Sequence, residues 1–129
     1  MEQRDIRYAY CKGPVMETRG CTAYYDGVKL HVCTHSQGLH DEKMRLAEAL
    51  GVDGSMLNYV SPYTGSSFGG KNATPLDINI PSHYLLIAGF ACLKLRRPVH
   101  CAYSREEEML CAWSRGSLSH VKIGFKKVG

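Results

Sequence analysis

The stretch with the clearest chemical potential is a glycine-rich loop, Gly65-Ser66-Ser67-Phe68-Gly69-Gly70-Lys71. Its glycines let the backbone approach a bound group closely, and its amides suit an anionic or polar ligand. The spacing of the first and last glycines before the lysine matches a phosphate-binding P-loop. However, Asn72 stands where a magnesium-binding serine or threonine is required, and the next helix is predicted only from about Pro81. Nucleotide hydrolysis is therefore a minor alternative.

A second group of residues has the ligand chemistry that zinc prefers. His31, Cys33 and His35 recur at every second position, so they could share one face of a strand, and His40 is nearby. No matching distant pair of ligands completes a tetrahedral site, and histidines on a polar face are usually solvated. A zinc site is thus another minor alternative.

The six cysteines are spaced without a CxxC pair. Several lie in apolar surroundings, as Cys92 does between Ala91 and Leu93, where a reduced thiol behaves as a small hydrophobe. This pattern favours a cytoplasmic protein with free thiols over a secreted disulfide scaffold. A cysteine nucleophile is a third alternative, although no signature singles out one thiol.

Length and composition indicate one globular domain over residues 1–129. With 44% hydrophobic and 22% charged residues, the chain can form a core. The net charge of +4 is scattered among acidic residues, which argues against binding to nucleic acid. The first residues are too polar for a signal peptide, and no apolar run reaches the roughly 18 residues that span a bilayer. We therefore expect no nucleic-acid partner and no membrane partner.

The elements before the loop follow from local pattern. Cys21–Tyr25 and Val28–Thr34 are β-branched and aromatic runs joined by Asp26-Gly27, which predicts a hairpin with Val28, Leu30 and Val32 on its buried face. Good helix formers with acidic residues in the first turn predict a helix over Asp41–Leu50 that ends at Gly51. A strand over Met56–Val60 then leads into the loop.

The elements after the loop are equally regular. Tyr84–Leu95 is apolar on nearly all sides, which predicts a centrally buried helix. A strand is expected over Val99–Tyr103, followed by a short helix from Ser104 to about Ala112 that opens with a capping box. We interpret its acidic run, Glu106–Glu108, as a solvated helix start. The alternation over Val121–Phe125 predicts a last strand.

The order of these elements indicates an α+β fold. We expect a mixed β-sheet with one central buried helix, shorter flanking helices and layered α/β packing. Residues 1–20 give no clear pattern.

Several separated motifs, taken in order, resemble the cofactor-binding region of the molybdenum hydroxylases, the xanthine dehydrogenase and aldehyde oxidase family. The motifs are Ser36–His40, Met44–Gly51, Gly65–Lys71, Arg97–Val99 and Tyr103–Leu110. The resemblance extends from about Pro14 to the C-terminus. The loop departs from the family pattern because Ser66 and Ser67 replace two glycines.

The resemblance implies roles for individual residues. Gln37 would hydrogen-bond an oxo ligand of molybdenum, a task that suits a neutral amide. The backbone of Phe68 and Gly69 would lie against the metal and its pterin, with Gly70 binding the cofactor in the same loop. The pterin holds the metal, so no side chain is expected to ligate it directly. Asn72 falls where xanthine dehydrogenases carry a substrate-binding glutamate, which places it in the substrate pocket and argues against purine oxidation.

The resemblance also implies an oxidoreductase that hydroxylates an aldehyde or an N-heterocycle with water-derived oxygen. Its cofactor would be molybdopterin, in simple or dinucleotide form, with iron-sulfur centres and FAD on partner domains or subunits. The family's general base comes from a later segment, so we expect no catalytic residue here. The chain would be a catalytically incomplete fragment that packs against the remaining segments of the molybdenum subunit, and a homodimer is one expected assembly. The alternative is a non-catalytic cofactor-handling or assembly module with the same fold.

Overall fold

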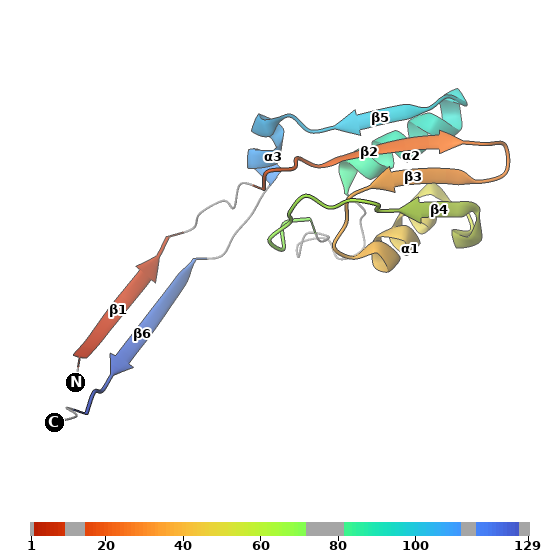
Figure 1. The fold of residues 1–129 in the computed structure, drawn as a ribbon. Helices are drawn as coiled ribbons and strands as arrows, with labels where there is room; N and C mark the ends of the chain where they lie inside the picture. Colours follow the sequence, from red (N-terminus) through yellow and green to blue (C-terminus); the bar gives the residue numbers. More distant parts are fainter. Residues whose placement is uncertain (1, 10–14, 72–81, 112–115, 127–129) are drawn as a thin grey trace.

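The computed structural model describes residues 2–9, 15–71, 82–111 and 116–126 (Figure 1). Within these ranges the chain forms six β-strands, three α-helices and one 3₁₀ turn. They are β1 (Glu2–Tyr8), β2 (Gly20–Tyr25), β3 (Leu30–Thr34), α1 (Leu39–Leu50), a 3₁₀ turn (Gly54–Met56), β4 (Leu57–Val60), α2 (His83–Leu95), β5 (Val99–Ala102), α3 (Arg105–Cys111) and β6 (Ser117–Ile123). The order confirms the predicted α+β class, and every strand and helix expected from the sequence is present.

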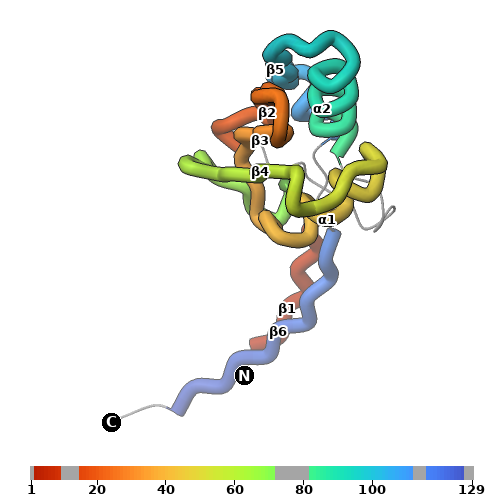
Figure 2. Tube along the Cα trace, turned by 90° about the vertical axis from the view of Figure 1, so that its right-hand side faces the viewer, coloured from red at the N-terminus to blue at the C-terminus, as the bar shows by residue number. Residues whose placement is uncertain are grey.

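The main body is built on a four-stranded mixed sheet with the strand order β4-β3-β2-β5. β2 pairs antiparallel with both β3 and β5, whereas β3 pairs parallel with β4. α1 and α2 both cover the same face of this sheet (Figure 2). The body is therefore a two-layer structure, in agreement with the predicted mixed sheet and layered packing.

The β2–β3 hairpin forms at the predicted Asp26-Gly27 turn. The Asp26 Oδ1 atom accepts hydrogen bonds from the amides of Val28 (2.8 Å) and Lys29 (2.7 Å), and Gly27 adopts a φ of 101°. The turn thus includes Val28, whose side chain is exposed. Its predicted place on the buried face was wrong, because the Asp26 side chain holds it in the turn and β3 begins only at Leu30.

The hydrophobic core lies between the sheet and the two helices. Alternate residues of the strands point into it, as Leu30 and Val32 do from β3, while α1 contributes Leu46 and α2 contributes Leu85. The core members are Cys21, Ala23, Leu30, Val32, Leu46, Ala47, Leu57, Tyr59, Tyr84, Leu85, Ala88 and Cys92. The α1 helix ends at Gly51 as predicted, and this glycine adopts a left-handed conformation.

The α2 helix covers the sheet with only one side. Its inner residues are buried, but Ile87 and Phe90 are 59% and 62% exposed, and Leu95 is exposed as well. The predicted helix is confirmed, whereas its central burial was wrong. Its apolar composition does not distinguish a helix covered on every side from one that packs on a single sheet face.

The β1 and β6 strands form a separate antiparallel ribbon that projects away from the body (Figures 1 and 2). The prediction of a strand near Val121 is confirmed, but β6 pairs with β1 and not with the main sheet. β1 gave no signal in the sequence because its residues do not alternate between apolar and polar. Among the described helices, none combines the length and the apolarity that crossing a bilayer requires.

Candidate functional site

Two segments meet at the edge of the sheet where β3 and β4 end. These strands are parallel, so their carboxyl ends share one edge, the position at which sheets of α/β proteins commonly bind ligands. β3 continues into the segment that contains Gln37, and β4 continues into the glycine-rich loop. The amide of Ser36 donates to the Ser61 hydroxyl at 3.3 Å, which ties the two segments together.

The glycine-rich loop presents an exposed tip. Ser66, Phe68 and Gly69 have left-handed φ values of 80°, 46° and 80°, and the amide of Gly70 donates to the Ser67 carbonyl at 2.8 Å. The Phe68 side chain is 82% exposed, and an added Cβ at Gly69 would meet no atom within 4 Å. The backbone of the tip is therefore open to a bound group.

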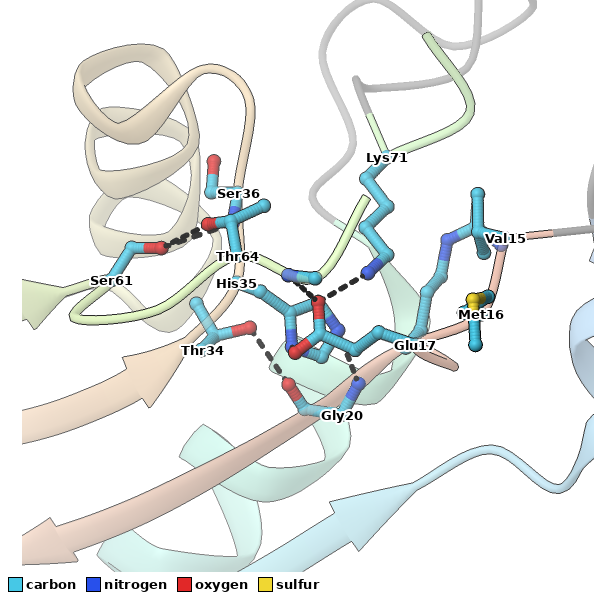
Figure 3. A network of polar contacts seen from close by, with 12 residues as sticks. Val15, Met16, Glu17, Gly20, Thr34, His35, Ser36, Ser61, Thr64 and Lys71 are labelled. Carbon is cyan, nitrogen blue, oxygen red and sulfur yellow. Dashed lines mark hydrogen bonds and ion pairs between the residues drawn. The ribbon is translucent and has the colours of Figure 1, made fainter. Parts of the chain in front are cut away.

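A single carboxylate oxygen contacts both ends of this loop (Figure 3). The Glu17 Oε2 atom accepts a hydrogen bond from the Gly65 amide at 2.7 Å and from the Lys71 ammonium at 2.8 Å. The Lys71 side chain is 0% exposed. The ion pair occupies the ammonium group that a P-loop would offer to phosphate, which argues against nucleotide hydrolysis.

His35 completes this polar cluster from the end of β3. Its Nε2 atom accepts from the Gly20 amide at 3.2 Å, so the proton of the neutral ring lies on Nδ1, 3.3 Å from Glu17 Oε1. Burial and the neighbouring Lys71 charge lower the pKa of His35. Burial raises the pKa of Glu17, but hydrogen bonds from Lys71 and Gly65 outweigh this effect and hold that pKa below its ordinary value. The cluster therefore favours a neutral histidine beside an ionised carboxylate.

A buried ion pair supports the cluster from α3. The Arg19 guanidinium donates to Glu108 Oε1 at 2.7 Å, the Arg19 amide donates to Glu108 Oε2 at 2.8 Å, and the guanidinium also donates to the Gly70 carbonyl. α3 opens with the predicted capping box between Ser104 and Glu107. The interpretation of the whole acidic run as solvated was wrong for Glu108, which is 1% exposed because it faces Arg19.

The predicted site residues lie in these two neighbouring segments, with one exception. Gln37 is exposed between β3 and α1, and Phe68, Gly69 and Gly70 form the loop tip and its tight turn. Asn72 falls outside the described residues. Sequence reasoning missed Glu17, Arg19 and the role of Glu108, because their partners lie 48 to 89 residues away in the chain and leave no local pattern.

Two of the residues considered for zinc, His31 and His35, make other contacts. His31 contacts Asp26 at 2.7 Å through Nε2 and the Asn58 amide at 2.9 Å through Nδ1, and its ring stacks on Tyr24. His35 belongs to the Glu17 cluster. In the part of the chain that the structure describes, no three histidine, cysteine or acidic side chains are grouped to hold a metal ion. The zinc alternative therefore has no support here.

The described cysteines are free thiols. Burial, followed by the neighbouring Cys101 and Cys33, raises the pKa of Cys21 to about 12. Burial also raises the pKa of Cys92. Both shifts disfavour the thiolate that a nucleophile needs.

Comparisons with known proteins identify a family and several relatives. The family described as "Molybdopterin cofactor-binding domain" matches residues 2–129. The large subunit of nicotine 6-hydroxylase from Paenarthrobacter nicotinovorans is 37% identical over 81% of the chain. The aldehyde oxidoreductase molybdenum-binding subunit PaoC from Escherichia coli K12 is 30% identical over 88% of it. The chain spans only 12% and 15% of these two proteins.

Solved structures show the same fold at lower sequence identity. Quinoline 2-oxidoreductase from Pseudomonas putida 86 matches with a TM-score of 0.67 and 22% identity, over 83% of the chain and 13% of that protein. The CO dehydrogenase from Oligotropha carboxidovorans matches with a TM-score of 0.68 and 20% identity, over 91% of the chain and 13% of its own length.

Proposed function

The chain belongs to the molybdopterin cofactor-binding domain family, and on this premise we propose that it forms one side of the cofactor site in a molybdenum oxidoreductase. The reaction we propose is hydroxylation of an aldehyde or an N-heterocycle with water-derived oxygen. The names of the relatives support both substrate classes, since one is an aldehyde oxidoreductase subunit and the other a nicotine hydroxylase subunit. The observation that carries the proposal is the family match combined with an open loop tip at the carboxyl edge of parallel strands.

The residues of the loop fit a large polar cofactor. The Ser66 and Ser67 hydroxyls are buried and have no hydrogen-bond partner among the described residues. Buried hydroxyls are normally hydrogen-bonded, so these two suit contact with a polar group of the cofactor. The open space at Gly69 allows such a group to approach the backbone. When bound, the molybdenum cofactor supplies the two-electron redox chemistry.

The chain's own residues would bind and orient the cofactor. We propose that the exposed Gln37 amide donates a hydrogen bond to it and that the Phe68–Gly69 backbone lies against it. Gly70 makes the close turn beneath the tip, where an added Cβ would lie 3.2 Å from the Ser67 carbonyl oxygen. Asn72 is proposed for the substrate pocket, and purine oxidation of the xanthine dehydrogenase type is not part of the proposal.

The partners we propose follow from the size of the relatives. The matched proteins are named as subunits, and the chain covers a small part of each. We propose that residues 1–129 form one part of a larger molybdenum-binding domain and pack against its remaining segments, with iron-sulfur and FAD domains or subunits as electron acceptors. A cytoplasmic location and a homodimer complete the proposal, and the free thiols of the described cysteines support the location.

The proposal is tested by the molybdenum and pterin content of the complete reading-frame product, expressed in a host that makes the cofactor. Gly69→Ala adds a Cβ at the open tip and should lower the molybdenum-to-protein ratio several-fold. Gly27→Ala is the matched control, because Gly27 also has a positive φ and open space at its Cβ position but lies in the β2–β3 turn. Equal molybdenum content in the two variants would contradict the proposed binding surface.

The 129-residue chain alone provides a second arm of this test. We expect it to retain little molybdenum, because it supplies one side of the site. Stoichiometric cofactor in the isolated chain would show that the site is complete within these residues.

A further inference from the structure

We infer that Glu17 is a positioning residue that bonds to both ends of the glycine-rich loop and holds its Phe68–Gly69 tip in the ligand-binding conformation. The identity of the ligand rests on the proposed function. Glu17 lies outside the motifs that identify the loop. Its hydrogen bonds to the loop go to Gly65 and Lys71.

One oxygen atom fixes the separation of the loop ends. Glu17 Oε2 lies 2.7 Å from the Gly65 nitrogen and 2.8 Å from Lys71 Nζ. An added Cβ at position 65 would make tight contacts, 3.1 Å from Glu17 Cβ and 3.3 Å from Oε2, and the Glu17 side chain would have to shift by a few tenths of an ångström. Glycine at position 65 thus leaves room for the Glu17 carboxylate that accepts the hydrogen bond from its amide.

Lys71 is buried at the end of the loop. Its side chain is fully enclosed, while the Glu17 side chain keeps 32% of its surface exposed. A buried ammonium without a partner is strongly unfavourable. Lys71 can therefore stay inside only while Glu17 remains ionised beside it, and the end of the loop is held there with it.

The loop contains strained residues. Ser66 and Phe68 adopt left-handed φ values that side-chain-bearing residues rarely take, and such conformations persist when the surroundings fix them. Between residues of the loop itself, the described hydrogen bonds comprise only the one from the Gly70 amide to the Ser67 carbonyl. The restraint must come from outside the loop, and Glu17 supplies it at both ends.

Glu17 lies in a segment that is itself anchored. Arg105 of α3 donates hydrogen bonds to the carbonyls of Val15 and Met16, directly before Glu17. Two residues later, Arg19 pairs with Glu108 of α3 and donates to the Gly70 carbonyl. The segment from Val15 to Arg19 is therefore fixed to α3 on one side and to the loop on the other.

The test measures hydrogen exchange of the backbone amides in the 129-residue chain by NMR. Glu17→Gln removes the charge and one acceptor, and should raise exchange at Gly65 and Gly70 by at least about tenfold. The core amides of Val32 and Leu85 should stay strongly protected and exchange much more slowly than the loop amides, which separates loop opening from global unfolding. Glu106→Gln is the matched control, because this carboxylate is exposed on α3, and it should leave all these rates unchanged.

A second variant covers the case in which Glu17→Gln fails to fold. Lys71→Met removes the buried charge while keeping the Glu17 contact to Gly65, so exchange should rise at Gly70 and stay slow at Gly65. The inference would be overturned if Glu17→Gln exchanged at the wild-type rate at Gly65 and Gly70. Wild-type exchange at Gly70 in Lys71→Met would overturn it as well.

The cofactor arm uses the complete reading-frame product. Glu17→Gln should lower its molybdenum-to-protein ratio several-fold and alter the electron paramagnetic resonance signal of the metal that remains, whereas Glu106→Gln should change neither. Wild-type content and signal in Glu17→Gln would overturn the ligand-binding half of the inference. If the wild type itself binds no molybdenum, the proposed function fails, while the exchange rates still decide whether Glu17 positions the loop.

Discussion

In the four-stranded sheet, alternate residues of β2, β3 and β4 are buried beneath two helices, whereas every residue of β1 is exposed. Both regions have regular antiparallel pairing, so hydrogen bonds between strands do not distinguish them. The difference lies in what covers their side chains. An isolated two-stranded ribbon is marginally stable in water. The stability of the chain must therefore reside in the body, together with the polar cluster that supports the loop.

The two regions also place their charges differently. Arg19 and Glu108 pair inside the body with side chains 6% and 1% exposed, whereas Asp5 and His120 pair on the ribbon with 61% and 66% exposed. Both pairs have short contacts, of 2.7 and 2.6 Å. Solvent screening weakens the exposed pair, and removing one partner of the buried pair leaves a charge without compensation. Similar geometry should thus have very different energetic consequences.

The largest expected effect is the loss of the buried pair. Glu108→Ala should lower the free energy of unfolding by about 3 to 5 kcal/mol, because it leaves the Arg19 guanidinium buried without a partner. Asp5→Ala on the ribbon should lower it by no more than about 1 kcal/mol. Urea denaturation of the two variants and the wild type measures both values. Equal losses would show that the ribbon contributes to the folded core as the body does.

A smaller contrast is expected for apolar side chains. Leu85 is fully buried in α2, so Leu85→Ala should lower the free energy of unfolding by about 2 to 5 kcal/mol. Ile6 of β1 is half exposed, and Ile6→Ala should lower it by less than about 1 kcal/mol. The same denaturation experiment applies. A large effect at Ile6 would contradict the contrast between the body and the ribbon, because it would mean that the Ile6 side chain packs against another surface.

The smallest expected effect is the pH dependence of the body. The folded state lowers the pKa of both Glu17 and His35, so the unfolded chain binds more protons as pH falls. Stability should decline from about pH 7 downward as His35 resists protonation, and again below about pH 4 as Glu17 does. His35→Gln should flatten the first decline and Glu17→Gln the second. Stability that rises on acidification through these ranges would contradict the charge states assigned to the cluster.

The features predictable from sequence were those with a local cause. Asp26-Gly27 specified a hairpin, Ser104 and Glu107 formed the expected capping box, and Gly51 ended α1 as predicted. By contrast, the pairing of Arg19 with Glu108 joins residues 89 positions apart and has no local pattern. The exposed side of α2 could not be predicted either, because its residues are as apolar as those of the buried side.

The candidate site divides in the same way. The loop and Gln37 were identified through their resemblance to a family, and the structure places their segments at one sheet edge. Their roles toward the cofactor stay predictions. Glu17 emerged only from the contacts, since its partners Gly65 and Lys71 lie far away in the sequence. The candidate binding motifs were therefore readable from sequence, while the residues that hold them in place were not.

The position of the cofactor in a structure of the complete, molybdenum-loaded protein tests the central claim most directly. We predict that the molybdenum cofactor contacts the Phe68–Gly69 backbone and the Gln37 amide, with Glu17 still bonded to Gly65 and Lys71. A cofactor bound away from the shared edge of β3 and β4, with the loop tip and Gln37 in solvent, would contradict it.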